Sequence, residues 1–218
     1  MRPRAVEKAS EWLDVFDERG RWWGWQDRDT VHRRGLWHRT FHCWVLLGEP
    51  DAEAPSGLLL QRRSASKRTH PGCLDVAAAG HLRAGEPVRS GVREVAEELG
   101  RAPAWGELIP LGVTRTVLTG PGWVDRERCH EFLWVTRERL EAFRPDPDEV
   151  EALVVVDWAD AGRLFAGTLA RVTATVREAA ASRTDVVEVT MADFVPRGRL
   201  YWRRHWDAIA RVSAGEAG

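Results

Sequence analysis

Three glutamates with helical spacing are the residues of this sequence that most clearly indicate chemistry. Glu94, Glu97 and Glu98 stand at positions i, i+3 and i+4, so a helix carries their side chains on one face, expected to be an exposed patch. Carboxylates gathered in this way repel one another, and a divalent cation such as Mg²⁺ relieves the repulsion because it prefers oxygen ligands. The spacing therefore indicates either a Mg²⁺ (or Mn²⁺) site or a solvated glutamate-rich helix face.

A helix is expected to position these carboxylates. Apolar residues recur beside them at helical spacing and predict one narrow stripe, formed by Val88, Val92, Val95 and Leu99. Gly100 follows as a natural helix stop. Arg93 precedes Glu97 by one turn, so we expect its guanidinium to hold the carboxylates in place.

The whole stretch from residue 80 to residue 100 resembles the Nudix box, the motif of hydrolases that cleave nucleoside diphosphates linked to another group. The box consists of Gly, five residues, Glu, seven residues, and then Arg-Glu-apolar-x-Glu-Glu-x-Gly. Its named positions are filled here by Gly80, Glu86, Arg93, Glu94, Val95, Glu97, Glu98 and Gly100. Two details depart from the pattern: only six residues separate Glu86 from Arg93, and Arg101 stands where an apolar residue is expected.

Length, charge and cysteine content narrow the class of protein. The 218 residues suit one domain, or one domain with an extension. The formal net charge of −1 gives no electrostatic reason to expect nucleic acid or a membrane surface as partner, and no apolar run approaches the ~20 residues of a membrane span. Three cysteines, Cys43, Cys73 and Cys129, form no CxxC pair, which favours a reducing cytoplasm.

Strand-like segments surround the expected helix. Residues 11–27 have the pattern of a hairpin, and further strands are predicted over 40–47, 58–61, 74–76, 104–119, 130–135 and 153–158. Strands that flank a central helix in mixed order predict an α+β sandwich. The resemblance to the box implies the Nudix fold, in which a mixed β-sheet lies between α-helices.

The C-terminal quarter is expected to be mainly helical. An amphipathic helix is predicted over 160–182, a short strand over 186–189 and a further helix over 197–212. We therefore expect a Nudix domain over residues 1–165, including the N-terminal hairpin, and a C-terminal helical extension over 166–218 packed on the same core. Four arginines of that extension are interpreted as solvated surface, with phosphate binding as the alternative: Arg197, Arg199, Arg203 and Arg204.

Further segments resemble one Nudix branch, that of type 1 isopentenyl diphosphate isomerase and its hydrolase-like relatives. They are HRRGLWHRTFH at 32–42, QRRSASKRTHPG at 61–72, and DRERC at 125–129, followed by PDEV at 147–150. In the isomerase, the residues that match Arg63 and Lys67 bind the substrate diphosphate. The residue types alone also suit this role, because both follow the end of a predicted strand. Arginine can bind diphosphate oxygens through its planar fork of donors, and lysine through its point charge. A solvated basic loop is the other reading.

The same branch implies a second metal site. His32, His38, His81 and Glu127 match isomerase positions that bind a second metal, and sets of histidine and carboxylate suit Mn²⁺, Zn²⁺ or Fe²⁺. The His32–His38 spacing is one residue shorter than in the isomerase, and Asp125 replaces a glutamate. Three neighbouring residues are alternative ligands: His42, His130 and Glu131.

These observations predict a Nudix hydrolase of a small-molecule diphosphate, either nucleotide-like or isoprenoid-like. Mg²⁺ on the box glutamates would neutralise developing charge and activate a water molecule, with one of the carboxylates or Glu127 as the base.

Two other functions stay open, an isopentenyl diphosphate isomerase and a non-catalytic diphosphate-binding module. The intact glutamates argue against the module, because a binder has no need of them. The isomerase has a catalytic cysteine where this chain has Ala79, whose methyl group can neither donate nor accept a proton. Cys73 lies six residues earlier, about 20 Å away if the segment is extended.

Overall fold

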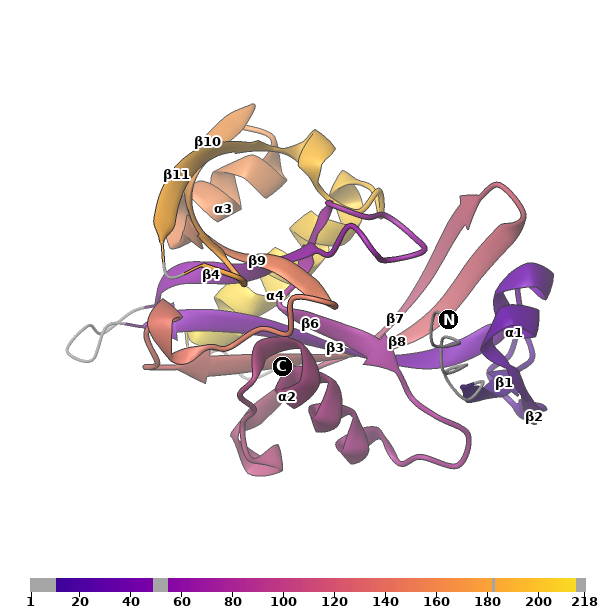
Figure 1. Ribbon diagram of the computed structural model, residues 1–218. Coiled ribbons are helices and arrows are strands. Elements are labelled where there is room, and N and C mark those ends of the chain that lie inside the picture. Colours follow the sequence, from indigo (N-terminus) through magenta and orange to yellow (C-terminus); the bar gives the residue numbers. More distant parts are fainter. Residues whose placement is uncertain (1–10, 49–54, 182, 215–218) are drawn as a thin grey trace, which may run out of the picture.

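The computed structural model describes residues 11–48, 55–181 and 183–214 (Figure 1). Its helices are α1 (Arg28–Arg34), α2 (Val92–Leu99), α3 (Trp158–Ala166) and α4 (Arg199–Ser213). Its strands are β1 (Trp12–Phe16), β2 (Trp22–Asp27), β3 (Trp37–Gly48), β4 (Pro55–Arg63), β5 (Leu74–Val76), β6 (Ala78–His81), β7 (Leu108–Gly120), β8 (Trp123–Thr136), β9 (Val150–Asp157), β10 (Arg171–Glu178) and β11 (Thr184–Thr190). In these ranges, the structure has no helix with the length and apolar character needed to cross a membrane.

The strands form one mixed sheet with β3 at its centre. Hydrogen-bonded neighbours follow the order β11-β10-β9-β4-β3-β1-β2, and β8 pairs in parallel with β3 and antiparallel with β7. The short strands β5 and β6 pair with β4 and β3. Because β3 pairs with β1 near its start and with β4 near its end, it joins the N-terminal hairpin to the body of the sheet (Figure 1).

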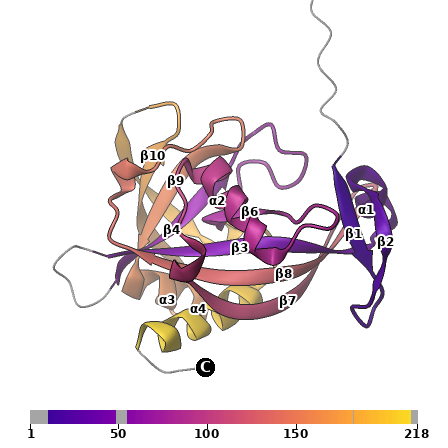
Figure 2. The same cartoon turned by 90° about the horizontal axis from the view of Figure 1, so that it is seen from below.

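Alternating side chains of β3 separate two cores. Trp44 and Leu46 belong to the core that includes α3 and α4, whereas Cys43, Val45 and Leu47 belong to the core that includes α2. Successive side chains of a strand point to opposite faces, so this strand is buried on both. Figures 1 and 2 show α2 on one side of the sheet and α3 and α4 on the other. The expected α+β class, a mixed sheet between helices, is confirmed.

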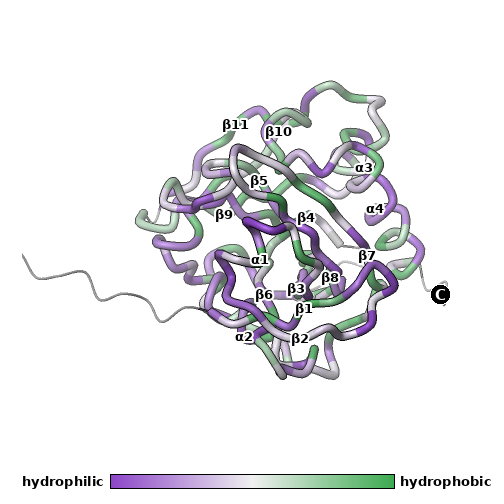
Figure 3. The backbone as a smooth tube through the Cα atoms, turned by 90° about the vertical axis from the view of Figure 1, so that its right-hand side faces the viewer, coloured by the Kyte–Doolittle hydropathy of each residue, from purple (hydrophilic) through white to green (hydrophobic). Residues whose placement is uncertain are grey.

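The N-terminal hairpin is confirmed, and the helix that follows it was not predicted. The Asp27 carboxylate accepts the Thr30 N–H and caps the start of α1, and Gly35, at φ 60°, ends the helix in the left-handed conformation. This short helix turns the chain back, so that β3 begins beside β1. Figure 3 looks onto this end of the molecule, where α1, β1, β3 and β6 meet.

The helix predicted over 160–182 is confirmed at its start, and its extension beyond residue 166 was wrong. The helix α3 ends at Ala166 because Gly167 follows in the left-handed conformation, at φ 80°. In β10, buried and exposed residues alternate, which is the period of a strand and not of a helix. The extension over 166–218, expected to be mainly helical, therefore contributes two strands to the sheet before α4: β11, expected over 186–189, and β10, which was not predicted.

Candidate active site

The three glutamates of α2 do not share one exposed patch. Glu94 and Glu98 are only 9% and 3% exposed, whereas the Glu97 side chain is 50% exposed. The expectation was wrong because Glu94 and Glu98 each lie next to a buried apolar residue of α2, on the side of the helix that packs against β6. At Gly80 of β6, an added Cβ would clash with the Glu94 carboxyl group. A glycine at this box position therefore lets the helix carboxylate lie against the strand.

Glu98 is held by three groups from outside its helix. Its Oε2 accepts hydrogen bonds from the Gln61 amide at 2.7 Å and from the Ala79 backbone N–H at 2.9 Å. The Lys67 ammonium lies 3.5 Å from Oε1. Burial raises the pKa of Glu98, and these three partners oppose the rise without cancelling it. A predicted metal ligand, Glu98, is thus in contact with a predicted diphosphate ligand, Lys67.

Arg93 links the loop of the box to the helix. Its guanidinium lies 3.2 Å from Glu86 and 2.6 Å from Glu94. It also lies 3.1 Å from Glu97. The segment between Glu86 and Arg93, one residue shorter than in the box pattern, therefore still lets the two side chains meet. Burial raises the pKa of Glu94 to about 7, an effect that Arg93 opposes.

The α2 carboxylates are paired with cations of the protein rather than with one another. Within the described residues, ligand atoms of Glu94, Glu97 and Glu98 do not form a group within 4.8 Å. Arg93 and Lys67 stand against them instead. The oxygen donors fit Mg²⁺ or Mn²⁺ in chemistry. An ion bound here would take over part of the charge balance that these two side chains provide.

In the basic connection that runs from the end of β4 to β5, the two predicted diphosphate ligands are not solvated. The side chains of Arg63 and Lys67 are 14% and 20% exposed. Arg63 donates to the Thr69 carbonyl through Nε at 3.3 Å and Nη2 at 3.1 Å, and its Nη1 lies 3.7 Å from Asp75. Lys67 forms an ion pair with Glu149. Both predicted diphosphate ligands thus lie in ion pairs beside the box.

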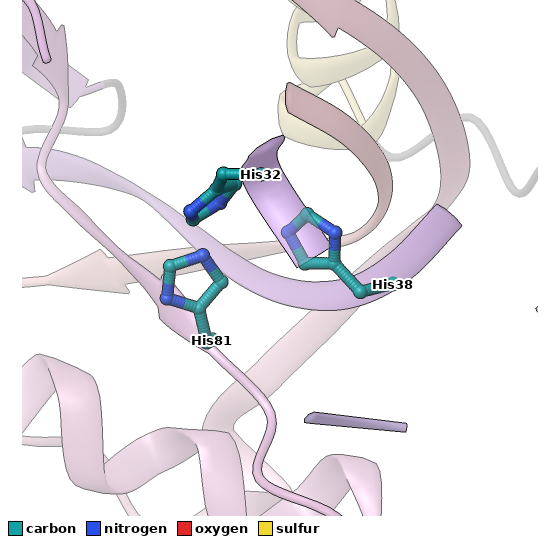
Figure 4. Close-up of side chains that lie close together, drawn as sticks. All are labelled: His32, His38 and His81. Carbon is teal, nitrogen blue, oxygen red and sulfur yellow. The ribbon is translucent and has the colours of Figure 1, made fainter. Parts of the chain in front are cut away.

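Three histidines from separate elements form a cluster at the hairpin end of the sheet (Figure 4). His32 belongs to α1, His38 to β3 and His81 to the end of β6. Their ring centroids lie 5.2 Å (His32–His38), 5.3 Å (His32–His81) and 5.1 Å (His38–His81) apart. One ring nitrogen of each lies within 4.8 Å of the other two. The fold therefore gathers the three histidines that the sequence singled out.

Two carboxylates of β8 adjoin this cluster. Asp125 Oδ1 lies 3.5 Å from His32 Nε2 and 3.4 Å from His38 Nε2. Glu127 forms a group with Asp125 and His38 within 4.8 Å, because the parallel register of β3 and β8 sets His38 beside Glu127. In the sequence, Asp125 stood out only as the replacement of a glutamate. Its i, i+2 spacing to Glu127, which puts both side chains on one face of a strand, is the signal that could have added it.

Several polar atoms of the cluster are buried and make no hydrogen bond within the described residues. Among the described residues, His32 Nε2, His38 Nε2 and Asp125 Oδ1 have no hydrogen bond. Buried polar atoms are normally satisfied, so orphans that face one another fit a bound ion. His38 Nδ1 lies 3.0 Å from the Leu36 carbonyl, and a proton donated there leaves the Nε2 lone pair toward the cluster. Burial, followed by the charge of His81, lowers the pKa of His38 to about 4, so this ring is neutral near pH 7.

Glu127 lies between the cluster and an arginine of the C-terminal segment. Its Oε2 accepts hydrogen bonds from the Thr116 hydroxyl at 3.1 Å and from Arg197 Nη1 at 2.9 Å. Burial by itself raises the pKa of Glu127, but the nearby positive charges of Arg197 and His42 hold it below its ordinary value. The interpretation of Arg197 as solvated surface was wrong, because its side chain is only 5% exposed. No local pattern of the sequence marks such an arginine.

Two of the alternative ligands contact the C-terminal helix α4. His42 and Glu131 lie 3.5 Å apart, and both contact the Tyr201 hydroxyl of α4. His42 also groups with Glu127 and Cys129 within 4.8 Å. These buried polar contacts dock α4 onto β3 and β8.

A cavity of about 190 Å³ opens beside the cluster. It is lined by Asp29, His32, Arg33, Arg68, Gly122 and Trp123. These residues come from α1, from the β4–β5 connection and from the start of β8 with its preceding turn. His32 belongs both to the lining and to the cluster, so the cavity adjoins the cluster.

A family model and curated proteins match most of this chain. The model of the NUDIX domain matches residues 36–178. An uncharacterized Nudix hydrolase of Clostridium acetobutylicum is 37% identical over 155 residues, which are 71% of this chain and 74% of that protein. An isopentenyl-diphosphate Delta-isomerase of Streptomyces coelicolor is 31% identical over 152 residues, or 68% and 72% of the two chains.

A solved structure shares the fold at low sequence identity. The crystal structure of a MutT/nudix family protein from Enterococcus faecalis superposes with a TM-score of 0.52 at 13% identity, over 81% of this chain and 62% of that one. At this identity the likeness concerns the fold alone. It agrees with the mixed sheet and flanking helices expected from the box.

Proposed function

Because this chain belongs to the Nudix family of hydrolases, we propose that it cleaves a diphosphate linkage in a small molecule with the help of Mg²⁺ or Mn²⁺. The contact between Glu98 and Lys67, at 3.5 Å, carries the proposal. It brings the glutamates of the box next to the basic connection. A metal ion bound by the glutamates and phosphate oxygens bound by Arg63 and Lys67 would therefore be neighbours. The substrate class that fits is a nucleotide-like or isoprenoid-like diphosphate.

Arg63 and Lys67 are assigned to the diphosphate oxygens. Arg63 offers a planar set of donors and Lys67 a compact charge, and such charge-assisted hydrogen bonds are the stronger kind. Both side chains now pair with acidic residues of the protein, Asp75 and Glu149. A diphosphate competes well for them because it brings several negative oxygens at once.

The box residues are assigned to the reacting end of the substrate. A divalent ion on Glu94, Glu97 and Glu98 would supply charge neutralisation and an activated water. Glu94, whose pKa burial raises to about 7, is suited to accept a proton near neutral pH, and Arg93 keeps it oriented. Glu127 is the alternative base, but the low pKa that Arg197 imposes makes it the weaker proton acceptor.

The histidine cluster is assigned to a second metal ion. His32, His38 and His81, with Asp125 and Glu127, offer nitrogen and oxygen donors that suit Mn²⁺, Zn²⁺ or Fe²⁺. The unpartnered, buried ring nitrogens support this assignment. Near neutral pH the lowered pKa of His38 keeps that ring in the form that binds metal.

An isomerase is the alternative, and two observations favour it. The chain is 31% identical to isopentenyl-diphosphate isomerases, and the histidine cluster with Glu127 matches their implied metal site. Ala79 opposes it, because proton transfer needs a donor and an acceptor across the substrate and a methyl group is neither. The Ala79 backbone N–H is engaged by Glu98. A binding module without catalysis is disfavoured by the buried box glutamates, whose burial a mere binder would not require.

Screening of nucleotide and isoprenoid diphosphates with Mg²⁺ and Mn²⁺ tests the proposal. We expect phosphate or diphosphate release by the unmodified protein and its loss in Glu98→Gln, which keeps the size of the side chain and removes its charge. Labelled isopentenyl diphosphate, followed for conversion to the dimethylallyl isomer, tests the alternative. Robust isomerisation by the unmodified protein would replace the hydrolase proposal, and release that survives in Glu98→Gln would refute the role of the box.

A further inference from the structure

Arg197 enters the candidate site from a segment that the family model does not match. The match ends at residue 178, whereas Arg197 lies between β11 and α4. The segment is fixed against β5, because the Val195 N–H donates to the Leu74 carbonyl at 2.9 Å and Phe194 forms an isolated bridge with Leu74. Because of this attachment, Arg197 lies beside Asp75, the residue that follows Leu74.

The guanidinium holds two buried carboxylates at once. Arg197 Nη1 lies 2.9 Å from Glu127 Oε2, and Nη2 lies 3.3 Å from Asp75 Oδ2. The side chains of Arg197, Glu127 and Asp75 are 5%, 8% and 1% exposed. A buried charge without a partner is costly, and the planar fork of arginine lets one side chain compensate two carboxylates.

The hydrogen bonds that Glu127 accepts from described residues converge on one of its oxygens. Thr116 and Arg197 both donate to Oε2, and the Cys129 thiol lies 3.7 Å from the same atom. These contacts fix the plane of the carboxylate. None of these three contacts uses Oε1, and Glu127 lies within 4.8 Å of His38 and Asp125 as well as of His42 and Cys129.

Asp75 extends the contact to the basic connection. Its Oδ2 lies 3.3 Å from Arg197 and 3.7 Å from Arg63 Nη1. One carboxylate oxygen therefore stands between the two arginines. Glu127, Arg197, Asp75 and Arg63 form a continuous series of ion pairs from the histidine cluster to the proposed diphosphate ligands.

We propose that Arg197 is a positioning residue, which fixes Glu127 as a ligand of the histidine cluster and, through Asp75, orients Arg63 toward the substrate diphosphate. The second part rests on the proposed function, whereas the first concerns metal binding alone. Groups that orient a metal ligand typically change affinity or activity by about 10- to 100-fold when they are removed. The C-terminal segment is then part of the site.

Binding of Mn²⁺ measured by calorimetry on Arg197→Ala separates positioning from charge. A nearby positive charge repels a cation, so its removal alone would tighten binding at Glu127, whereas loss of positioning weakens it. The binding step that is lost in His38→Gln identifies the histidine cluster. In Arg197→Ala we expect Mn²⁺ to bind about 10- to 100-fold more weakly in that step. Unchanged or tighter binding overturns the proposal. Arg199→Lys is the matched control, because Arg199 begins α4 two residues later and donates to the Leu164 carbonyl, away from the cluster ligands.

Two further measurements exclude a merely structural role. Guanidinium ion added to Arg197→Ala should restore part of the lost Mn²⁺ affinity, and it should restore none to Glu127→Gln; absence of rescue in a folded Arg197→Ala protein counts against the proposal. Arg197→Lys keeps the charge without the fork and covers the case in which the alanine variant does not fold. Mn²⁺ affinity equal to wild type in Arg197→Lys would contradict the need for the fork.

The coupling to Arg63 has its own test. With a substrate found in the diphosphate screen, Arg197→Lys should raise KM in the same direction as Arg63→Ala, and an unchanged KM would remove the second part of the proposal. If the unmodified protein cleaves no diphosphate, the proposed function fails, and the Mn²⁺ measurements still decide the role of Arg197.

Discussion

The glutamates of α2 and the histidine cluster are two sets of candidate metal ligands that this protein treats in opposite ways. On α2, cationic side chains already stand against the carboxylates: Arg93 lies 2.6 Å from Glu94, and Lys67 lies 3.5 Å from Glu98. In the cluster, facing ring nitrogens and a carboxylate oxygen are buried with no hydrogen-bond partner among the described residues. The carboxylates of the first set each face a cation of the protein, whereas in the second set His32 Nε2, His38 Nε2 and Asp125 Oδ1 lack a hydrogen bond within the described ranges.

This difference indicates when each set binds an ion. A metal ion at α2 has to compete with Arg93 and Lys67 for the carboxylates. A bound diphosphate would help the ion, because it attracts the Lys67 ammonium to itself. At the cluster, the Nε2 atoms of His32 and His38 face no such competition, because they make no hydrogen bond to a described residue that an ion would have to displace. We therefore expect the cluster to bind a transition metal without substrate, and α2 to bind Mg²⁺ mainly together with substrate.

Glu98→Gln should give the largest effect. We expect a loss of about 10²–10³ in turnover, the scale seen when one strong electrostatic contact of a preorganised site is removed. Glu97→Gln should lose turnover as well, although its side chain is more exposed. Glu188→Gln, on β11 and paired with Arg171 of the neighbouring strand, is the control. Near wild-type turnover of both box variants at saturating Mg²⁺ would show that α2 is not the reacting region.

The pH dependence of stability should differ in sign between the two regions. Burial raises the pKa of Glu94 from 4.5 to about 7, so between these values the folded state binds more protons than the unfolded chain. The free energy of unfolding therefore falls as pH rises through this window, by up to about 3 kcal/mol. Urea unfolding in metal-free buffer from pH 4.5 to pH 8 measures this, and Glu94→Gln should flatten the decline.

For the cluster, the direction reverses. The pKa of His38 is lowered from 6.5 to about 4, so in that window the unfolded chain binds more protons. Stability is therefore lost as pH falls from 6.5 toward 4, and His38→Gln should remove this loss. If the free energy of unfolding depends on pH in the same way in wild type, Glu94→Gln and His38→Gln, neither Glu94 nor His38 titrates as its burial requires.

Loss of one cluster ligand should weaken metal binding by at least about 100-fold, more than the loss of an outer-shell group. We expect this for Zn²⁺ or Mn²⁺ with His38→Gln, measured by calorimetry without substrate. Glu98→Gln should leave the same binding step unchanged, because it belongs to the other region. A parallel loss in both variants would show that the two sets form a single site.

Alanine at Arg63 or Lys67 should have the smallest effect. We expect KM for every active diphosphate to rise about 10-fold, because a phosphate oxygen loses a charge-assisted partner. The rise should shrink in high salt, which screens the lost charge. Arg62→Ala is the control, since Arg62 pairs with Glu151 and Glu178 away from the box. If KM is unchanged for both variants, the basic connection does not hold the substrate.

Local residue spacing was enough to predict many of the elements of this protein. The box residues, the helix stop at Gly100 and the β1–β2 hairpin follow from short-range patterns, because backbone periodicity and turn chemistry act within a few residues. The choice of His32, His38 and His81 came from their resemblance to a family, and the fold confirms that these three rings gather. The same local pattern misled at 171–178, where valines fit a helix as well as a strand.

Tertiary structure alone decided which charges are buried and what they meet. Helical spacing put Glu94 and Glu98 on one face, but only packing against β6 made that face an interior one. Arg197 reaches Glu127 across 70 residues of sequence. A contact of that kind depends on the folded path of the whole chain, and no period within one segment encodes it.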